Sequence, residues 1–150
     1  MGMSQTTGAW ILAVIIPTLL AAGCSSPPPR LERKKPALEL KPCGTEVSRH
    51  GQGYNTEGRN CIWQAYLDRE PAVFTTTLHT IEGDPIVYKV QVTPRGVNVT
   101  VDSKDRFGQQ GVFTHTCRAF ERIKQEDRPD RFGFALSGCT GGGTDRLAVP

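Results

Sequence analysis

Three consecutive segments of this chain alternate apolar and polar residues with a period of two, and this pattern restricts the fold more than any other feature. The segments are residues 72–80, 86–92 and 97–102, and they are rich in valine and threonine. A period of two is typical of half-buried β-strands. The connections, residues 82–85 and 93–96, each contain a glycine and a proline, which are turn-forming residues. The pattern therefore predicts an antiparallel meander.

The same alternation predicts which face of the meander is buried. The apolar positions are expected to face the core: Ile86, Val90, Val92, Val97, Val99 and Val101. The polar positions are expected to face solvent: Thr75, Thr77, His79, Lys89, Gln91, Asn98 and Thr100. Antiparallel sheets are commonly covered on one face and solvated on the other, so we expect a helix to cover the apolar face.

Residues 60–67 predict that helix, because their apolar side chains recur four residues apart. Pro71 is expected to end it. Two further strands are predicted at residues 112–120 and 132–136, with a polar turn between them. The predicted fold class is α+β, mainly β, with a short N-terminal helix packed on an antiparallel meander of about five strands.

Four cysteines lie in the segment 43–150, which is long enough for one domain with its own core. They are Cys43, Cys61, Cys117 and Cys139. An even number in an exported domain suggests two disulfides. Their order and the strand layout predict pairs between Cys43 and Cys61 and between Cys117 and Cys139. No Cys-x-x-Cys motif is present, which argues against a thioredoxin-like redox site, and the wide spacings do not suit a zinc knuckle.

The N-terminal region resembles a bacterial lipoprotein signal. The uncharged apolar run of residues 9–22 has the length of the hydrophobic part of a signal peptide and is too short to span a bilayer, although no lysine or arginine precedes it. It leads into Leu19-Leu20-Ala21-Ala22-Gly23-Cys24, which resembles a lipobox. The resemblance implies a signal peptide over residues 1–23, a diacylglycerol on Cys24 and a lipid-anchored extracytoplasmic protein, in the inner or the outer membrane. The alternatives are a plain signal peptide with an incidental cysteine and a buried apolar helix.

Residues 24–42 are predicted to form an acylated, extended tether. Five prolines prevent a continuous helix or a central strand. Five basic and two acidic residues give the tether a charge of +3, which is the whole net charge of the chain, because the charges from Cys43 onward cancel. The overall basicity therefore gives no support to nucleic-acid binding. The basic residues of the tether can bind anionic lipid headgroups, or the tether can serve only as a spacer.

A second group of motifs runs through residues 60–150. It consists of Cys61-Ile62-Trp63-Gln64-Ala65-Tyr66, Pro71-Ala72 before a threonine-rich strand, Thr116-Cys117, and Ser137-Gly138-Cys139 before Val149-Pro150. Together these motifs resemble a set of small exported bacterial lipoproteins with a disulfide-stapled β-domain. Members often carry one more cysteine pair, at positions that match Arg69 and Val99 here, and this chain lacks it. The family has no established activity, so the resemblance implies location and architecture only.

Residues that could carry chemistry are sparse. His50, His79 and His115 have no His-x-x-x-His spacing or paired carboxylates beside them, which leaves a metal or acid–base site without support. Strand parity places His115 on the same side as Cys117. The glycine-rich stretch 138–144 lacks the lysine of a phosphate-binding loop. No catalytic residue, metal or cofactor is therefore predicted.

The sequence favours a non-catalytic binding or accessory module of the cell envelope, because no nucleophile, base and orienting group form a recognisable set. The solvent face of the meander offers short polar side chains, of which Thr77, His79 and Lys89 are the candidate ligand-contacting residues. The expected partners are the membrane, through the lipid, and another envelope protein or a cell-wall component, with no nucleic acid. The alternatives are a small extracytoplasmic hydrolase with an unrecognised site, or an enzyme inhibitor.

Overall fold

The computed structural model describes residues 38–49, 52–126 and 128–150, which all belong to one unit, residues 36–150. The predicted signal peptide, Cys24 and the tether up to residue 37 lie outside the described residues, as does His50. The first strand begins at Lys41, so it includes the last two residues of the predicted tether. No helix in the described ranges is long and apolar enough to cross a membrane.

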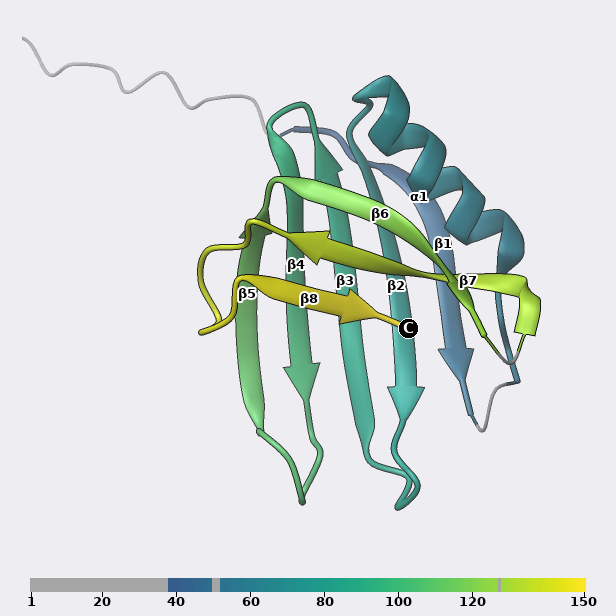
Figure 1. Ribbon diagram of the computed structural model, residues 1–150, viewed down its shortest axis with the longest axis vertical. Helices are drawn as coiled ribbons and strands as arrows, with labels where there is room; N and C mark the ends of the chain where they lie inside the picture. Colours follow the sequence, from purple (N-terminus) through teal and green to yellow (C-terminus); the bar gives the residue numbers. More distant parts are fainter. Residues whose placement is uncertain (1–37, 50–51, 127) are drawn as a thin grey trace, which may run out of the picture. The chain divides into compact units, whose positions relative to one another are not determined.

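The described residues form one helix and eight strands (Figure 1). In chain order these are β1 (Lys41–Ser48), α1 (Thr56–Asp68), β2 (Ala72–His79), β3 (Pro85–Thr93), β4 (Gly96–Ser103), β5 (Gly111–Cys117), β6 (Ala119–Gln125), β7 (Arg128–Ser137) and β8 (Arg146–Val149). Strands β1 to β5 make one sheet in that order, and β6 to β8 make a second sheet. The fold is mainly β with a helix packed on the larger sheet, which confirms the predicted class.

The first sheet contains the predicted meander. β2, β3, β4 and β5 are antiparallel neighbours in chain order. The turns predicted at residues 82–85 and 93–96 lie where β2 passes to β3 and β3 passes to β4. Short connections of this kind can join only antiparallel strands, so turn chemistry and alternation together determine this part of the fold.

Strand β1, in contrast, has no counterpart in the prediction. It pairs with β2 in parallel, and α1 forms the crossover that a parallel pair requires. The pairing register shifts between Pro42 and Thr45, so the buried residues Cys43 and Glu46 lie three positions apart instead of two. This irregularity removes the alternation by which a strand is recognised in a sequence.

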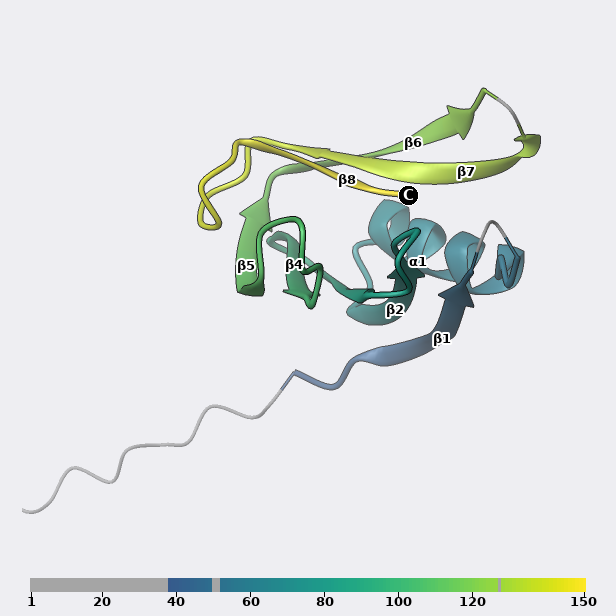
Figure 2. The same ribbon diagram turned by 90° about the horizontal axis from the view of Figure 1, so that it is seen from below.

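The prediction of a single strand over residues 112–120 is wrong, because the chain turns at Arg118 and enters the second sheet. β5 ends at Cys117, and β6 begins at Ala119. The Arg118 N–H donates a hydrogen bond of 3.1 Å to the carbonyl oxygen of Ser137, which ties the corner to the end of β7. The second sheet lies over the same face of the first sheet as α1 (Figure 2).

The core lies between the two sheets and is completed by α1. The positions predicted to face it do so: Val90, Val92, Val97 and Val99 are fully buried, Val101 is largely buried and Ile86 is partly buried. Phe120 and Phe134 stack in the second sheet, with ring centroids 4.5 Å apart. From α1, Ile62 is fully buried, and the Trp63 and Tyr66 rings lie 5.9 and 5.3 Å from the Phe120 ring. The helix therefore packs against both sheets.

Helix α1 includes the predicted range 60–67 and starts one turn earlier. Asn55 caps its N-terminus, since the Asn55 side chain accepts a hydrogen bond of 2.9 Å from the Gly58 N–H. At the other end Arg69 adopts a left-handed conformation with φ of 57°, and Pro71 follows. The predicted stop at the proline is therefore confirmed.

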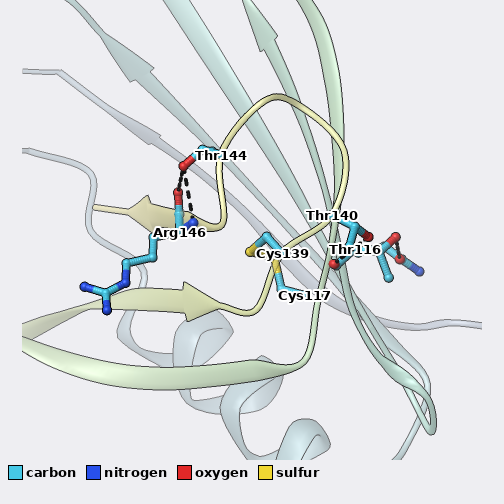
Figure 3. The surroundings of a disulfide bond; sticks show 7 residues. Thr116, Cys117, Cys139, Thr140, Thr144 and Arg146 are labelled. Carbon is cyan, nitrogen blue, oxygen red and sulfur yellow. Dashed lines mark hydrogen bonds between the residues drawn. A yellow bond between two sulfur atoms is a disulfide. The ribbon is translucent and has the colours of Figure 1, made fainter.

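Two disulfides join the cysteines in the predicted pairs, Cys43 with Cys61 and Cys117 with Cys139. The second connects the end of β5 to the segment after β7, with Cα atoms 3.9 Å apart (Figure 3). Thr116 and Thr140 exchange two main-chain hydrogen bonds of 2.9 Å just beside it. Cys117 and Cys139 are thus the next pair along, opposite each other but without main-chain hydrogen bonds between them. In antiparallel strands such non-hydrogen-bonded pairs have the closest Cα atoms.

Each disulfide connects elements that are not neighbouring strands of one sheet. Cys43 with Cys61 holds β1 to α1, and Cys117 with Cys139 holds the first sheet to the second. Stable disulfides form in oxidising compartments. The two bonds therefore indicate an oxidising, extracytoplasmic location.

Candidate functional site

The candidate ligand-contacting residues belong to strands of the first sheet, one face of which is turned away from α1 and the second sheet (Figure 2). Thr77 and His79 belong to β2, and Lys89 belongs to β3. Thr76 is fully buried against the core, so its neighbour Thr77 points outward. Lys89 pairs with Thr75, the outward residue that precedes Thr77 on the same face. The structure thus brings all three predicted residues onto one surface.

The cross-strand register arranges the outward residues in two rows. The first row consists of Thr45, Thr75, Lys89, Thr100 and Thr114, and the second consists of Val47, Thr77, Val87, Asp102 and Val112. Directly opposed side chains of neighbouring strands lie about 5 Å apart. We call these two rows, together with His79, the outer face. It presents threonine hydroxyl groups on β1, β2, β4 and β5, whereas β3 contributes Lys89 and Val87.

The first row of the outer face is polar throughout, and the second row includes three valines. Val47 on β1 and Val112 on β5 are 52% and 64% exposed. Asp102 is engaged by Lys104 in an ion pair of 2.8 Å. The Nδ1 atom of His79 is buried and has no hydrogen-bond partner among the described residues. This surface can therefore donate hydrogen bonds to hydroxyl and amine groups and accept hydrogen bonds from them. Val47 and Val112 offer apolar contact.

His115 lies on the core side of β5, as its parity with Cys117 predicts. It is only 3% exposed, and its Nδ1 atom has no hydrogen-bond partner in the described part of the chain. Gly142 lies directly against the imidazole ring. The ring is thus enclosed by packing on the core side, with no nucleophile that it activates among the contacts of the described residues.

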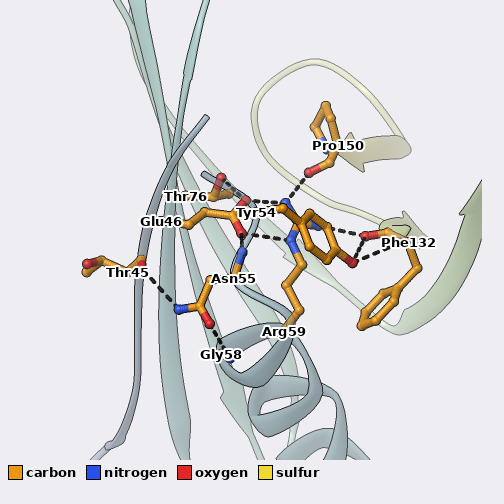
Figure 4. A network of polar contacts seen from close by, with 9 residues as sticks. All are labelled: Thr45, Glu46, Tyr54, Asn55, Gly58, Arg59, Thr76, Phe132 and Pro150. Carbon is orange, nitrogen blue, oxygen red and sulfur yellow. Dashed lines mark hydrogen bonds and ion pairs between the residues drawn. The ribbon is translucent and has the colours of Figure 1, made fainter. Parts of the chain in front are cut away.

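A buried polar centre, which sequence reasoning missed, lies where β1, α1 and the second sheet meet (Figure 4). Arg59 of α1 and Glu46 of β1 form an ion pair whose side chains are 2% and 1% exposed. The Arg59 Nε–H donates to the Glu46 carboxylate at 2.9 Å, and one terminal N–H donates to the Phe132 carbonyl at 2.9 Å. A further N–H donates to the main-chain oxygen of Pro150. Arg59 therefore connects the first strand to the end of the last.

The Glu46 carboxylate is fully engaged within this centre. It accepts hydrogen bonds of 3.0 Å from the Asn55 N–H and 2.7 Å from the Thr76 hydroxyl, besides those from Arg59. Burial by itself raises the pKa of Glu46, but the hydrogen bonds and the charge of Arg59 outweigh it and hold the pKa below the ordinary value of 4.5. Glu46 thus stays ionised at neutral pH and is unsuited to act as a general acid.

Aromatic rings complete the enclosure of the Arg59 side chain. The guanidinium carbon lies 4.7 Å from the Tyr54 ring centroid and within 6 Å of the Phe74 and Phe134 rings. A desolvated guanidinium over an aromatic face gains further electrostatic attraction. The Tyr54 hydroxyl in turn donates to the Phe132 carbonyl at 3.0 Å. We call Arg59 and the groups that it contacts on Glu46, Phe132 and Pro150 the clamp, because they join β1, α1 and the second sheet.

A pocket of about 540 Å³ opens beside this clamp. Glu46, Tyr54, Arg59, Leu78, Arg128 and Arg131 are among its lining residues. Charges of both signs line it, and its two buried charges already satisfy each other. The lining thus contains three arginines and two glutamates, an excess of one positive charge.

The described residues contain no group of three or more histidine, cysteine, aspartate or glutamate side chains that could hold a metal ion. The clamp could not be recognised in the sequence, because Glu46 follows an irregular part of β1 and Arg59 precedes the apolar positions of the helix. Comparison of the chain with family models, curated proteins and solved structures finds no match.

Proposed function

We propose that the protein is a lipoprotein of the bacterial cell envelope, anchored through Cys24, and that it acts as a non-catalytic binding or accessory module. Its ligand is another envelope protein or a cell-wall component, and it binds on the outer face through Thr77, His79 and Lys89. The observation that carries the proposal is the outer face itself, since α1 and the second sheet both pack on the opposite side of the first sheet. The extracytoplasmic location that the disulfides indicate agrees with this assignment.

The chemistry of the outer face fits a binding role better than a catalytic one. Threonine hydroxyls form hydrogen bonds at little cost in side-chain entropy, and strands hold them at fixed spacing. Both ionic groups in the two described rows, Lys89 and Asp102, lie at the surface, and Asp102 is paired with Lys104. A sheet face of this kind recognises a partner by shape and hydrogen bonding.

Lipid attachment is tested by metabolic labelling with a fatty-acid analogue in the native host. The natural chain is expected to incorporate the label, and Cys24→Ala is expected to lose it and to leave the membrane fraction. Two buried acyl chains hold a protein on a membrane stably, so the difference should be nearly complete. Label on the Cys24→Ala chain would contradict the assignment.

The binding surface is tested by replacing Thr77, His79 and Lys89 together with alanine. A matched control replaces Glu57, Glu121 and Lys124, which are exposed and lie outside the outer face. Cross-linking in the intact envelope and sedimentation with purified cell wall measure binding. We expect the first variant to lose its partner and the control to keep it, with both still folded. Equal binding by both variants would contradict the proposal, and a hydrolytic activity lost in His115→Ala would favour an enzyme.

A further inference from the structure

One end of the domain carries an unbalanced group of arginines. Arg69 follows α1, Arg95 lies in the turn between β3 and β4, and Arg118 forms the corner between β5 and β6. All three are exposed and line one pocket of about 440 Å³, which also includes Tyr66 and has no acidic residue in its wall. We call these three arginines the basic end.

The guanidinium groups of the basic end have no partner in the part of the chain that the structure describes, residues 38–49, 52–126 and 128–150. None of the three makes an ion pair, a side-chain hydrogen bond or a ring contact within the described residues. The nearest acidic residues in the sequence are Asp68 and Glu70, beside Arg69, and Glu121, three residues after Arg118. Glu70 lies 3.8 Å from Lys41. Four cations against three acids leave this end net positive.

The opposite end of the sheet differs in charge. Its two loops carry Glu82, Asp84 and Asp105 against Lys104 and Arg106. Both of these cations are already engaged, Lys104 by Asp102 at 2.8 Å and Arg106 by Asp84 at 2.7 Å. The loops that join β2 to β3 and β4 to β5 therefore carry no described cation outside an ion pair, although Arg49 follows β1 at this end.

The basic end is also the end at which the N-terminal part of the chain joins the domain. β1 begins at Lys41, and Lys41 pairs with Ala72, the first residue of β2. The end of α1, the turn between β3 and β4 and the corner before β6 lie at this same end of the sheet (Figure 1). A membrane anchor upstream of β1 would thus be connected to the domain at the basic end.

We propose that the basic end docks on the phosphate groups of anionic lipid headgroups. This inference rests on the proposed lipid anchor for the orientation of the domain. Arginine matches phosphate oxygens with a planar fork of N–H donors, and three arginines around one pocket can share one or two headgroups. The anchor holds the chain on the bilayer, and the basic end holds the domain in one orientation. In this orientation the outer face does not lie on the membrane.

The test measures the reactivity of each arginine in the full chain. The purified protein is bound to vesicles of phosphatidylcholine alone or with about one third phosphatidylglycerol, treated with a dicarbonyl reagent specific for arginine, and mapped by mass spectrometry. We expect Arg69, Arg95 and Arg118 to react severalfold more slowly on the anionic vesicles, whereas Arg49 and Arg146 keep their rates. High salt should abolish the difference, because it screens surface charges.

A pair of variants with equal net charge provides the control. In a Cys24→Ala background, Arg69, Arg95 and Arg118 are replaced by glutamine in one chain, and Arg49, Lys104 and Lys124 in the other. The ratio of the vesicle binding constants on anionic and neutral lipid should fall about a hundredfold in the first variant, at about fivefold per arginine. In the second variant the ratio should change severalfold less. Equal loss in both variants, or no loss in the first, would overturn the proposal.

Two further outcomes distinguish a lipid headgroup from a soluble phosphate as the ligand, and the docking proposal from the lipid-anchor proposal. Protection of the basic end by inorganic phosphate without vesicles, and none by anionic vesicles, would assign the site to a soluble ligand and overturn the lipid proposal. The mass of the peptide that contains Cys24, read in the same digest, reports acylation independently. An acylated chain with an unprotected basic end rejects only this inference, whereas a protected basic end on an unacylated chain rejects only the anchor.

Discussion

The Arg59 guanidinium is held between the Glu46 carboxylate of β1 and the main-chain oxygen of Pro150, beyond the end of β8. The first and last strands of the described domain therefore meet at one buried side chain. Arg59 reaches this position from the first turn of α1, so the same contact fixes the helix between the two sheets. Removal of either charge is expected to loosen all three layers together.

The first prediction concerns the stability of this clamp. Arg59→Met should lower the free energy of unfolding by about 3–5 kcal/mol, because it leaves the Glu46 carboxylate buried without its partner. The double variant Glu46→Gln with Arg59→Met should lose less, since no charge is then left unpaired. Urea unfolding followed by circular dichroism measures both. A loss below about 1 kcal/mol in the single variant would show that water reaches the carboxylate.

The second prediction concerns pH. The pKa of Glu46 is lower in the folded chain than its ordinary value of 4.5, which applies when the chain is unfolded. The folded state therefore binds fewer protons, and the stabilisation is fully present above about pH 4.5 and disappears as the pH falls through the folded pKa. Glu46→Gln should flatten the fall in melting temperature between pH 5 and pH 3, roughly the range in which carboxylates titrate.

A control for the pH prediction comes from Asp84. Its pKa is also lowered, by hydrogen bonds from Arg106, but this pair lies at the surface. Exposed ion pairs contribute little to stability, so Asp84→Asn should leave the acid limb of the melting curve nearly as steep as in the natural chain. An equal flattening by both variants would contradict the special role of the buried pair.

The third prediction concerns the disulfides. The bond between Cys117 and Cys139 closes a sequence separation of 22 residues, and the bond between Cys43 and Cys61 closes 18. On the chain-entropy account each contributes about 3 kcal/mol. Replacing either pair with serine should lower the melting temperature by a similar amount, and the double replacement should unfold the domain. Non-reducing peptide mapping that joins Cys43 to Cys117 would contradict the pairing.

The alternation of residues 86–101 predicted the core of the meander because side chains in a regular strand alternate between the two faces. The same rule failed for β1, where a shift of register places Cys43 and Glu46 on the inside. The rule also predicted β5 and β6 as parts of one strand. Nothing in the local pattern marks the corner at Arg118, which depends on a hydrogen bond to Ser137.

The buried clamp was beyond prediction for a related reason. Arginine and glutamate are ordinarily surface residues, and only partners distant in the sequence make their burial tolerable. Arg59 contacts Phe132 and Pro150, which lie 73 and 91 residues away. The predicted outer-face residues Thr77, His79 and Lys89 were found on one surface because strand parity and turn length are local properties.

The last prediction concerns the glycine-rich segment that covers His115. Gly142 has φ of 59° and lies so close to the imidazole that an added Cβ would overlap the ring. Gly143, its neighbour, has φ of 77° but has nothing within 4 Å of the added Cβ. Gly143→Ala should therefore cost only the strain of a left-handed backbone, about 1 kcal/mol. Gly142→Ala should cost about 2–4 kcal/mol, because overpacking adds to the same strain.

Gly142→Ala is expected to lower the free energy of unfolding more than Gly143→Ala does. If this excess disappears when the imidazole ring is removed, the ring is its cause. His115 is buried and cannot swing into solvent, so the overlap must be relieved by moving the segment that carries Gly142. In a His115→Ala background, Gly142→Ala should cost no more than Gly143→Ala does in the natural chain, a coupling of about 1–3 kcal/mol. Chemical unfolding of the four chains measures this cycle. Additive losses would mean that the glycine is required for its backbone conformation alone.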